Sequence, residues 1–198
     1  MSDATILVAT ARMISRVGPA RLTLADVGDE VGLAPATLLQ RFGSKRGLLI
    51  AVVQQTLESV DESFTSVRAS PHSALDAAIA AAGTMAEHVR TPKELANNLA
   101  FFQVDLSDAE FHRLALEHSR RVRAGYQALL QEAITLGELI ECDAGALASA
   151  LQAVAAGSLL NWAIHRDGPV ADWVRADIET LISPYRTATV TPALTRRR

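Results

Sequence analysis

The stretch of sequence that decides the fold is residues 22–49, LTLADVGDEVGLAPATLLQRFGSKRGLL. Thr23, followed three residues later by Asp26, has the spacing of a capping box and marks the start of one short helix. Gly32 stands where that helix ends and the chain must reverse, a position that often needs a positive φ. Pro35 suits the first turn of a second helix, which runs to about residue 42. The pattern predicts two short helices joined by a tight turn.

The apolar residues of this stretch indicate how the two helices pack. Val27 and Val31 share one face of the first helix. Leu38 and Phe42 share one face of the second, so we expect all four in the core. Gly28 has no side chain at the point where the two helices would cross closely. Such a pair is a helix-turn-helix, whose second helix fits the major groove of DNA.

Helix signals continue outward from this motif in both directions. Before it, residues 5–17 carry apolar side chains at helical spacing and end at Gly18-Pro19. After it, the expected helix starts are Ser44, Ser70-Pro71, Thr91-Pro92, Ser107 with Glu110, Asp143 and about residue 170. The sequence has no strand pattern and no internal repeat. It therefore predicts an all-α fold, with an N-terminal three-helix head, a C-terminal helical body and about nine helices in all.

The predicted organisation has three parts. We expect residues 1–50 to form a helix-turn-helix DNA-binding domain, 51–185 a ligand-binding and dimerisation domain, and 186–198 a disordered, threonine-rich tail. Residues 1–50 carry a net charge of +2 and the remainder −5, so a mildly basic head joins an acidic body, which fits a local DNA contact. The helix that starts at Ser44 crosses the boundary, so head and body should share an interface.

Residues 6–53 resemble the DNA-binding head of the tetracycline-repressor (TetR) family of bacterial regulators. The positions that match the family pattern are Thr23, Gly32, Thr37, Leu38, Phe42, Ser44, Lys45, Leu48 and Leu49. The resemblance implies a transcriptional regulator, by family tendency a repressor, that binds a palindromic operator as a homodimer and is released by a small-molecule effector. Separately, a start without a signal-peptide pattern and the lack of an uncharged apolar segment of membrane-spanning length predict a soluble, cytoplasmic protein.

Three departures from the family pattern remove DNA contacts or a cap. Leu39 replaces the usual tyrosine, which contacts a phosphate, and Ala34 replaces the usual polar cap of the third helix. The basic arm that often precedes the first helix is missing. Each change removes about 1 kcal/mol of capping or phosphate contact, so we expect weak non-specific affinity or a different balance of contacts.

The residues expected to contact DNA divide by chemistry. Thr23 at a helix N-terminus and the charge of Lys45 suit phosphates. On the outer face of the third helix, arginine and glutamine side chains can read purine edges and apolar ones can touch thymine methyl groups. The residues expected there are Ala36, Thr37, Leu39, Gln40 and Arg41. The alternative for Gln40 and Arg41 is an ordinary solvated surface.

The eighth predicted helix is apolar on nearly all sides, so it must be covered on both of its faces. Both faces would be covered if the protein core packs on one face and a partner subunit packs on the other. The alternative is a larger monomeric core. The resemblance favours a dimer seam built from the eighth and ninth helices. The residues expected in that interface are Leu159, Leu160, Trp162, Val174, Ile178, Leu181 and Ile182.

Several polar and aromatic residues of the body lie on or near stripes that should be buried. They are Met85, Asn98, Phe101, Phe102, His118, Tyr126 and Asn161. Buried polar groups need partners, so these residues are either satisfied in the core or line a cavity bounded by helices four to eight. A mostly apolar lining indicates a hydrophobic or aromatic effector.

Other functional classes have less support in the sequence. One cysteine, Cys142, excludes an intrachain disulfide and a cysteine-based zinc site. No glutamate has a histidine three residues later, as a di-iron bundle needs, and phosphate-binding loops are absent. We therefore expect no enzyme activity, no catalytic or metal site and no cofactor. We also expect no signal peptide and no apolar segment long enough to span a membrane. An architectural DNA-binding protein without a ligand is the remaining alternative.

Overall fold

A computed structural model describes residues 1–69 and 73–187, and these residues form nine α-helices and one 3-10 turn. The helices are α1 (Asp3–Val17), α2 (Leu24–Val31), α3 (Pro35–Phe42), α4 (Lys45–Arg68), α5 (Ala74–Ala86), α6 (Pro92–Ser107), α7 (Ala109–Thr135), α8 (Ala144–His165) and α9 (Val170–Ile182), followed by the turn Ser183–Tyr185. The predicted all-α fold with about nine helices is confirmed.

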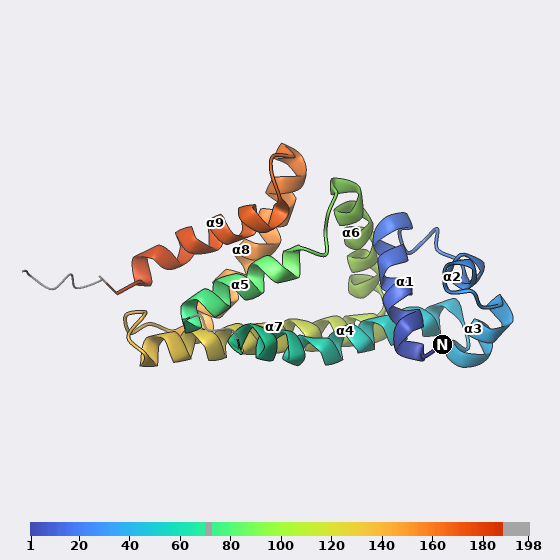
Figure 1. Ribbon diagram of the computed structural model, residues 1–198, viewed down its shortest axis with the longest axis horizontal. Helices are drawn as coiled ribbons and strands as arrows, with labels where there is room; N and C mark the ends of the chain where they lie inside the picture. The colour runs from blue at the N-terminus through green and yellow to red at the C-terminus, as the bar shows by residue number, and fades with distance from the viewer. Residues whose placement is uncertain (70–72, 188–198) are drawn as a thin grey trace, which may run out of the picture.

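The helices form a small head and a larger body (Figure 1). Helices α1, α2 and α3 gather at one end of the molecule, and the long helices α4 and α7 pack together along its length. Helix α6 lies across them beside α1, while α5, α8 and α9 pack together at the other end. The arrangement brings α1 of the head against α6 of the body, although about 80 residues separate them in sequence.

The helix-turn-helix forms for the reasons that its residues predict. The Thr23 hydroxyl accepts from the Asp26 backbone N–H at 3.1 Å, and the Asp26 carboxylate accepts from the Thr23 N–H at 2.9 Å. Gly32 ends α2 with φ +69°, a left-handed conformation that favours glycine. A Cβ atom on Gly28 would lie 2.4 Å from the carbonyl oxygen of Leu33, so only glycine permits this crossing.

One of the predicted helix starts is wrong, and another falls on residues that are not described. Helix α7 begins after Asp108 rather than Ser107, because the Asp108 carboxylate accepts from the N–H groups of both Glu110 and Phe111, whereas the Ser107 hydroxyl donates back into α6. Helix α5 is capped by Ser73, whose hydroxyl accepts from the Asp76 N–H. The predicted start at Ser70-Pro71 falls outside the described residues.

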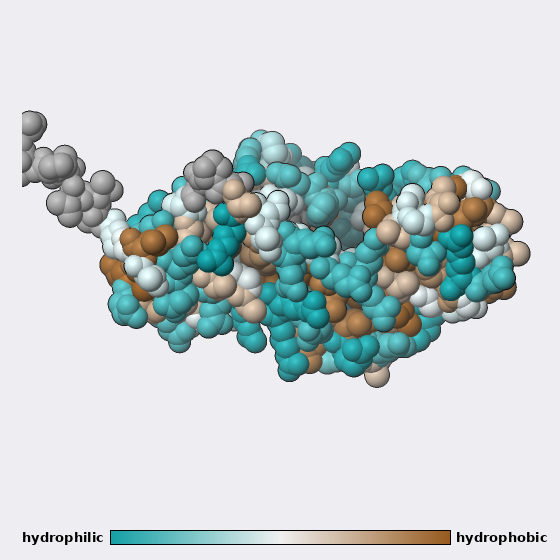
Figure 2. Space-filling view, turned by 60° about the horizontal axis from the view of Figure 1, so that its bottom comes forward, coloured by the Kyte–Doolittle hydropathy of each residue, from teal (hydrophilic) through white to brown (hydrophobic). Residues whose placement is uncertain are grey.

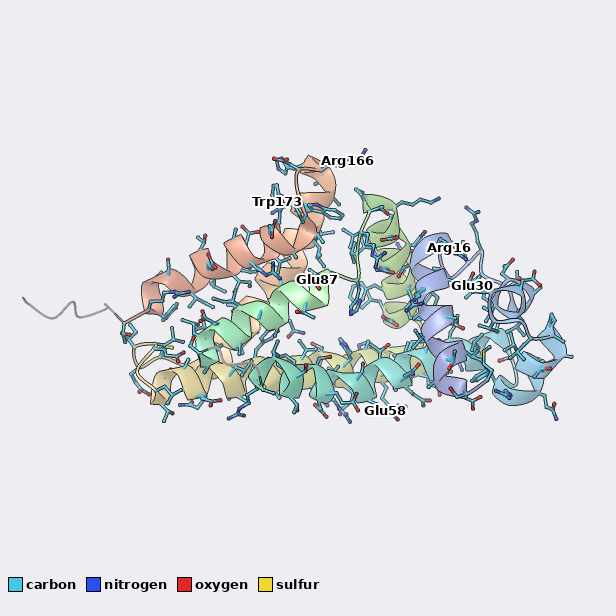
Figure 3. The ribbon with its side chains drawn as sticks, viewed as in Figure 1. Arg16, Glu30, Glu58, Glu87, Arg166 and Trp173 are labelled. Atoms are coloured by element: carbon cyan, nitrogen blue, oxygen red, sulfur yellow. The ribbon has the colours of Figure 1, made fainter. Side chains whose placement is uncertain are left out.

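Two clusters of buried apolar side chains stabilise the fold. The head cluster joins α1 to α4 and includes Ile6, Val27, Leu38 and Leu48. The body cluster is built from side chains of α4 to α9. Helix α4 contributes to both clusters, and Phe111 of α7 is buried in the head cluster. Arg16 of α1 and Glu30 of α2 add an ion pair of 2.8 Å within the head, and Figure 3 shows the two side chains together.

Helix α8 corrects one expectation from the sequence. Residues 144–165 carry no Asp, Glu, Lys or Arg, so this segment is long and apolar enough to cross a membrane by length and composition alone. The helix packs against α7 and α9, but only 28% of its most apolar window is buried inside the chain. One face of α8 is therefore left uncovered by its own chain.

The start of the predicted tail is paired with the body. Leu139 and Arg186 form an isolated antiparallel bridge, and the Thr187 hydroxyl donates to the Gly137 carbonyl oxygen at 2.7 Å. The rest of the predicted tail, residues 188–198, lies outside the described residues.

Candidate DNA-binding surface and ligand pocket

Helix α3 turns one face to the head core and the other to solvent. Leu38 is fully buried, whereas Ala36, Leu39 and Gln40 are exposed and Thr37 is half-buried. Residues 36, 39 and 40 thus lie on the surface that a groove-binding helix needs, and the head fixes that surface through Leu38.

The two basic residues of the predicted DNA contact are held by neighbours. The Arg41 guanidinium pairs with Asp3 at 3.0 Å and donates to the Met1 carbonyl oxygen at 3.1 Å. The Lys45 ammonium donates to the Ala20 carbonyl oxygen at 3.3 Å, which places it beside the loop that leads to α2. Both groups are partly exposed, and their partners are weak enough to exchange for a phosphate or a base.

Thr23, a third residue that the sequence predicts to contact DNA, lies at the N-terminus of α2. Thr23 is exposed and caps the helix, and its hydroxyl donates to the Asp26 carboxylate at 2.6 Å. This hydrogen bond, together with the one from the Thr23 N–H, lowers the pKa of Asp26. The carboxylate therefore stays ionised and holds the helix start in place.

A pocket of about 640 Å³ lies where head and body meet. Helix α1 contributes Ala11, Ile14 and Ser15 to its wall, and α4 contributes residues 52, 53 and 56. The remaining wall comes from α6, α7, one residue of α8 and His88, which follows α5. The lining is mostly apolar, as the sequence led us to expect of an effector site.

Four of the predicted ligand-binding residues line this one pocket. They are Asn98, Phe101, Phe102 and His118. Asn98 accepts a hydrogen bond of 2.9 Å from the Ser15 hydroxyl, so its amide also ties α6 to the head. The neighbouring Asn97 strengthens this tie, because its amide donates to the Ser15 carbonyl oxygen at 2.8 Å.

Three other predicted ligand-binding residues are not brought to the pocket. Tyr126 is buried in the body core, with its ring edge-on to Phe64 at 5.1 Å, and burial raises its pKa. Asn161 lies on the exposed face of α8, so the expectation that it sits on a buried stripe is wrong. Met85 belongs to α5, and its side chain falls outside the description.

Asp105 was not predicted from the sequence, and its carboxylate is the only one that the described residues contribute to the lining of this pocket. Its Oδ1 atom is buried and accepts no hydrogen bond from any residue that the structure describes. Burial raises the pKa of Asp105 to about 6, and burial lowers the pKa of His118. A signal was present, because Asn98, Phe101 and Asp105 recur at helical spacing on one face of α6.

The residues of the predicted dimer interface differ in how far they are buried within their own chain. Helix α9 packs its apolar stripe against α5 and α8 of its own chain, so its side chains are used inside the subunit. The buried residues are Trp162, Val174, Ile178 and Ile182, whereas Leu159 and Leu181 are partly buried. Leu160 is 46% exposed, and Ile164, four residues later on α8, is 77% exposed. On the face of the molecule seen in Figure 2, hydrophobic residues are interspersed with hydrophilic ones.

The corner between α6 and α7 is fastened to the start of α4. The Arg46 guanidinium pairs with Asp108 at 2.9 Å and with Glu110 at 2.7 Å, and it lies 5.5 Å from the ring centre of Phe111. Hydrogen bonds from Arg46 lower the pKa of Asp108. Phe111 in turn packs edge-on against Phe101, with ring centres 5.8 Å apart. A continuous set of contacts therefore runs from the pocket to the head.

Comparisons with known proteins agree with this geometry. Residues 6–52 match the family model described as bacterial regulatory proteins, tetR family. The transcriptional regulator BetI of Agrobacterium fabrum is 30% identical over 125 residues; the match spans 62% of this chain and 60% of the relative, which is less than two thirds of that protein's length.

Solved structures share the fold of the whole chain. A TetR transcription regulator from Haloarcula marismortui superposes with a TM-score of 0.77 at 18% identity, covering 93% of this chain and 98% of that one. A transcriptional regulator from Saccharomonospora viridis in complex with choline superposes with a TM-score of 0.72 at 18% identity, covering 91% of this chain and 95% of that one. SmeT, the repressor of a Stenotrophomonas maltophilia multidrug efflux pump, superposes with a TM-score of 0.69 at 17% identity, covering 100% of this chain and 96% of that one.

Proposed function

We propose that the chain, whose residues 6–52 match the model of the tetR family of bacterial regulatory proteins, is a ligand-responsive transcriptional repressor that binds a palindromic DNA operator as a homodimer. The observation that carries the ligand response is the pocket of about 640 Å³, whose wall is shared by α1 of the head and by helices of the body. A ligand there contacts both parts of the chain at once, so its binding bears directly on the position of the head.

The DNA contacts in this proposal come from α2, α3 and the start of α4. The exposed face of α3 enters the major groove, with Gln40 and Arg41 at base edges and Ala36 and Leu39 near thymine methyl groups. Thr23 and Lys45 hold phosphates on either side. Arg41 exchanges its Asp3 partner for DNA when the complex forms.

The homodimer in this proposal covers the bare face of α8. The exposed positions of that helix recur at helical spacing, and those toward its C-terminal end include Leu160 and Ile164. Two such faces packed around a two-fold axis remove this apolar surface from water, and they bring two heads to the same side of the molecule.

The ligand acts on the head through α4 and α6. Helix α4 lines the pocket with Val52 and Val53 and enters the head core at Leu49. A ligand that moves α6 or the middle of α4 therefore tilts the head and changes the distance between the two α3 helices of the dimer. Only one distance suits half-sites separated by whole helical turns, so the tilt releases DNA.

Selection of bound duplexes from a random DNA pool tests this function. We expect a palindromic consensus, bound by a species of twice the mass of the chain. Enrichment of a single, non-repeated site, or of no sequence at all, would contradict the proposal. A DNA complex that forms with high affinity but never responds to a compound known to bind the pocket would point to an architectural protein.

A further inference from the structure

We propose that the effector of this pocket is an organic cation, an apolar molecule whose single ammonium group pairs with the carboxylate of Asp105. The inference rests on the proposed function, because it names the class of ligand for the same pocket. It refines the expectation of a merely hydrophobic or aromatic effector.

The charge of the pocket wall is the first argument. Among the described residues, the titratable side chains of its lining are Asp105 on α6, His118 on α7 and His88 after α5, and the lining residues of α1, α4 and α8 are uncharged. None of the described lining residues is a lysine or arginine. The Asp105 carboxylate is therefore a negative charge that no lysine or arginine of the described wall balances.

The state of the Asp105 carboxylate is the second argument. One of its oxygen atoms is buried and receives no hydrogen bond from the described part of the chain, and burial raises its pKa to about 6. The group is still ionised at pH 7.5, so it carries a charge that the protein leaves unpaired. A bound cation supplies the missing partner, whereas an anion in the same place meets an unpaired like charge.

His118, the partly buried histidine of the pocket wall, does not reverse this preference for a cation. Burial lowers the pKa of His118, so the imidazole is neutral at pH 7.5 and can only donate or accept a hydrogen bond. It offers no positive charge to an anionic ligand. His118 thus fits a polar group of the ligand without changing its class.

The aromatic residues of α6 fit the rest of such a ligand. Phe101 and Phe102 precede Asp105 by about one helical turn and line the same pocket. Aromatic ring faces attract ammonium groups, and rings together with aliphatic side chains such as Ile14 and Val52 suit an apolar tail. The volume of about 640 Å³ lies in the range that holds ligands of drug size.

Three probes of the same length but different charge test the proposal by calorimetry at pH 7.5: 4-phenylbutylamine, 4-phenylbutan-1-ol and 4-phenylbutanoate. We expect the amine to bind at least about tenfold more tightly than the alcohol, and the acid not to bind at 1 mM. In Asp105→Asn the amine should lose that advantage while the alcohol binds as before. Asp76→Asn removes an exposed carboxylate of α5, outside the pocket, and should leave all three affinities unchanged.

The pH gives an independent readout. The amine keeps its charge between pH 5 and 7.5, but Asp105 takes up a proton below about pH 6 and any protonation of His118 adds repulsion. Amine affinity should therefore fall about tenfold from pH 7.5 to pH 5 in the native protein. In Asp105→Asn the fall should be much smaller, because only the histidines of the wall, His88 and His118, remain.

Equal or tighter binding of the alcohol or the acid would overturn the proposal, as would failure of all three probes to bind at 1 mM. DNA binding by the same protein preparations separates these outcomes from failure of the proposed function. A chain that selects a palindrome but rejects the amine is a regulator with a different effector. A chain that binds the amine but selects no DNA keeps the ligand class and loses the regulatory role.

Discussion

At the scale of single residues, the half-buried carboxylate of Asp105 raises the free energy of the folded protein. Its folded pKa of about 6 lies above the ordinary value of 3.8, so the folded state binds this proton more tightly than the unfolded chain does. The sign follows from that difference: the free energy of unfolding falls as pH rises from about 4 to about 6, and it stays lower at higher pH. A binding site of this kind therefore lowers stability at neutral pH.

Asp105→Asn should make the protein more stable at pH 7.5 in the absence of any ligand. The pKa shift discounted for the exposed half of the carboxylate gives a gain of about 1 kcal/mol in the free energy of unfolding. Urea denaturation at pH 7.5 and pH 4 measures it, and the gain should vanish at pH 4, where the native carboxyl is protonated too. A variant that is less stable than the native protein at pH 7.5 would show that Asp105 has a stabilising partner.

Arg41 and Lys45 should differ in the kind of DNA contact that they make. Lys45→Ala should weaken binding to operator and scrambled duplexes about equally and lower the salt slope by about one. Arg41→Ala should cost about 1–3 kcal/mol on the operator and relax specificity at one position of each half-site. Titrations at two salt concentrations compare the two variants.

Leu39 sharpens the comparison between Arg41 and Lys45. An exposed leucine cannot hydrogen-bond a phosphate, so Arg41 is the neighbouring group able to take over that duty. Equal loss of operator and random DNA binding in Arg41→Ala would assign it to the phosphate backbone and reject the base-reading role.

At the scale of helices, local signals predicted where most elements begin, but not which surface each element packs against. The capping box at Thr23 and the positive φ of Gly32 are decided within a few residues, and both predictions are confirmed. The apolar stripe of α9 shows only that a face is buried. That face packs on α5 and α8 of the same chain rather than on a partner, because the choice depends on contacts between distant segments.

Competition between neighbouring side chains explains the error at the start of α7. Ser107 and Asp108 both have capping side chains, and the spacing to Glu110 favoured Ser107 in the sequence. Asp108 prevails because its charged carboxylate accepts two backbone N–H groups and also pairs with Arg46. The second of these contacts comes from α4, more than sixty residues away, and is invisible in a local pattern.

The bare face of α8 should be what holds two chains together. Leu160→Glu combined with Ile164→Glu places two charges on that face, and light scattering at micromolar concentration should show the mass of one chain instead of two. Leu116→Glu, at an exposed leucine of α7 outside this face, is the matched control and should leave the mass unchanged. A double variant that keeps the native mass would move the interface elsewhere.

At the scale of the whole molecule, the contacts between Arg46, Asp108, Glu110 and Phe111 join the pocket to the head. Each ion pair is partly exposed and contributes little stability by itself. These ion pairs matter for their position, since they connect the start of α4 to the corner between α6 and α7. Transmission of ligand binding to DNA should therefore depend on them more than folding does.

Arg46→Gln should uncouple the two sites. We expect the affinities for pocket ligand alone and operator alone to stay within about threefold of native, while the effect of one on the other falls by about tenfold. Operator titrations with and without 4-phenylbutylamine measure the coupling. Arg175→Gln is the control, because it breaks a comparable exposed ion pair with Glu87, which lies at the end of α5 in Figure 3. This variant should keep the native coupling between ligand and operator. Full coupling in Arg46→Gln would mean that the signal passes through α4 or Ser15 instead.

The sequence predicted part of the pocket because Asn98, Phe101, Phe102 and His118 lie on periodic stripes. It did not predict the wall supplied by α1, because Ser15 and Asn98 are 83 residues apart and nothing local relates them. Long-range packing of the head on α6 decides that wall. The sequence did not predict the charge of the pocket for another reason. Asp105 looks like any other acidic residue in the sequence, and only the fold buries one of its oxygen atoms.

The shared wall has a consequence for anyone who builds chimaeric biosensors by exchanging heads between related regulators. A cut at residue 50 transplants Ala11, Ile14 and Ser15 along with the DNA-reading helices, so a new head brings a new part of the ligand site. Retargeting the operator in this way also retunes the sensor's chemical selectivity. A faithful exchange would graft only the outward side chains of α2 and α3 and keep the native α1.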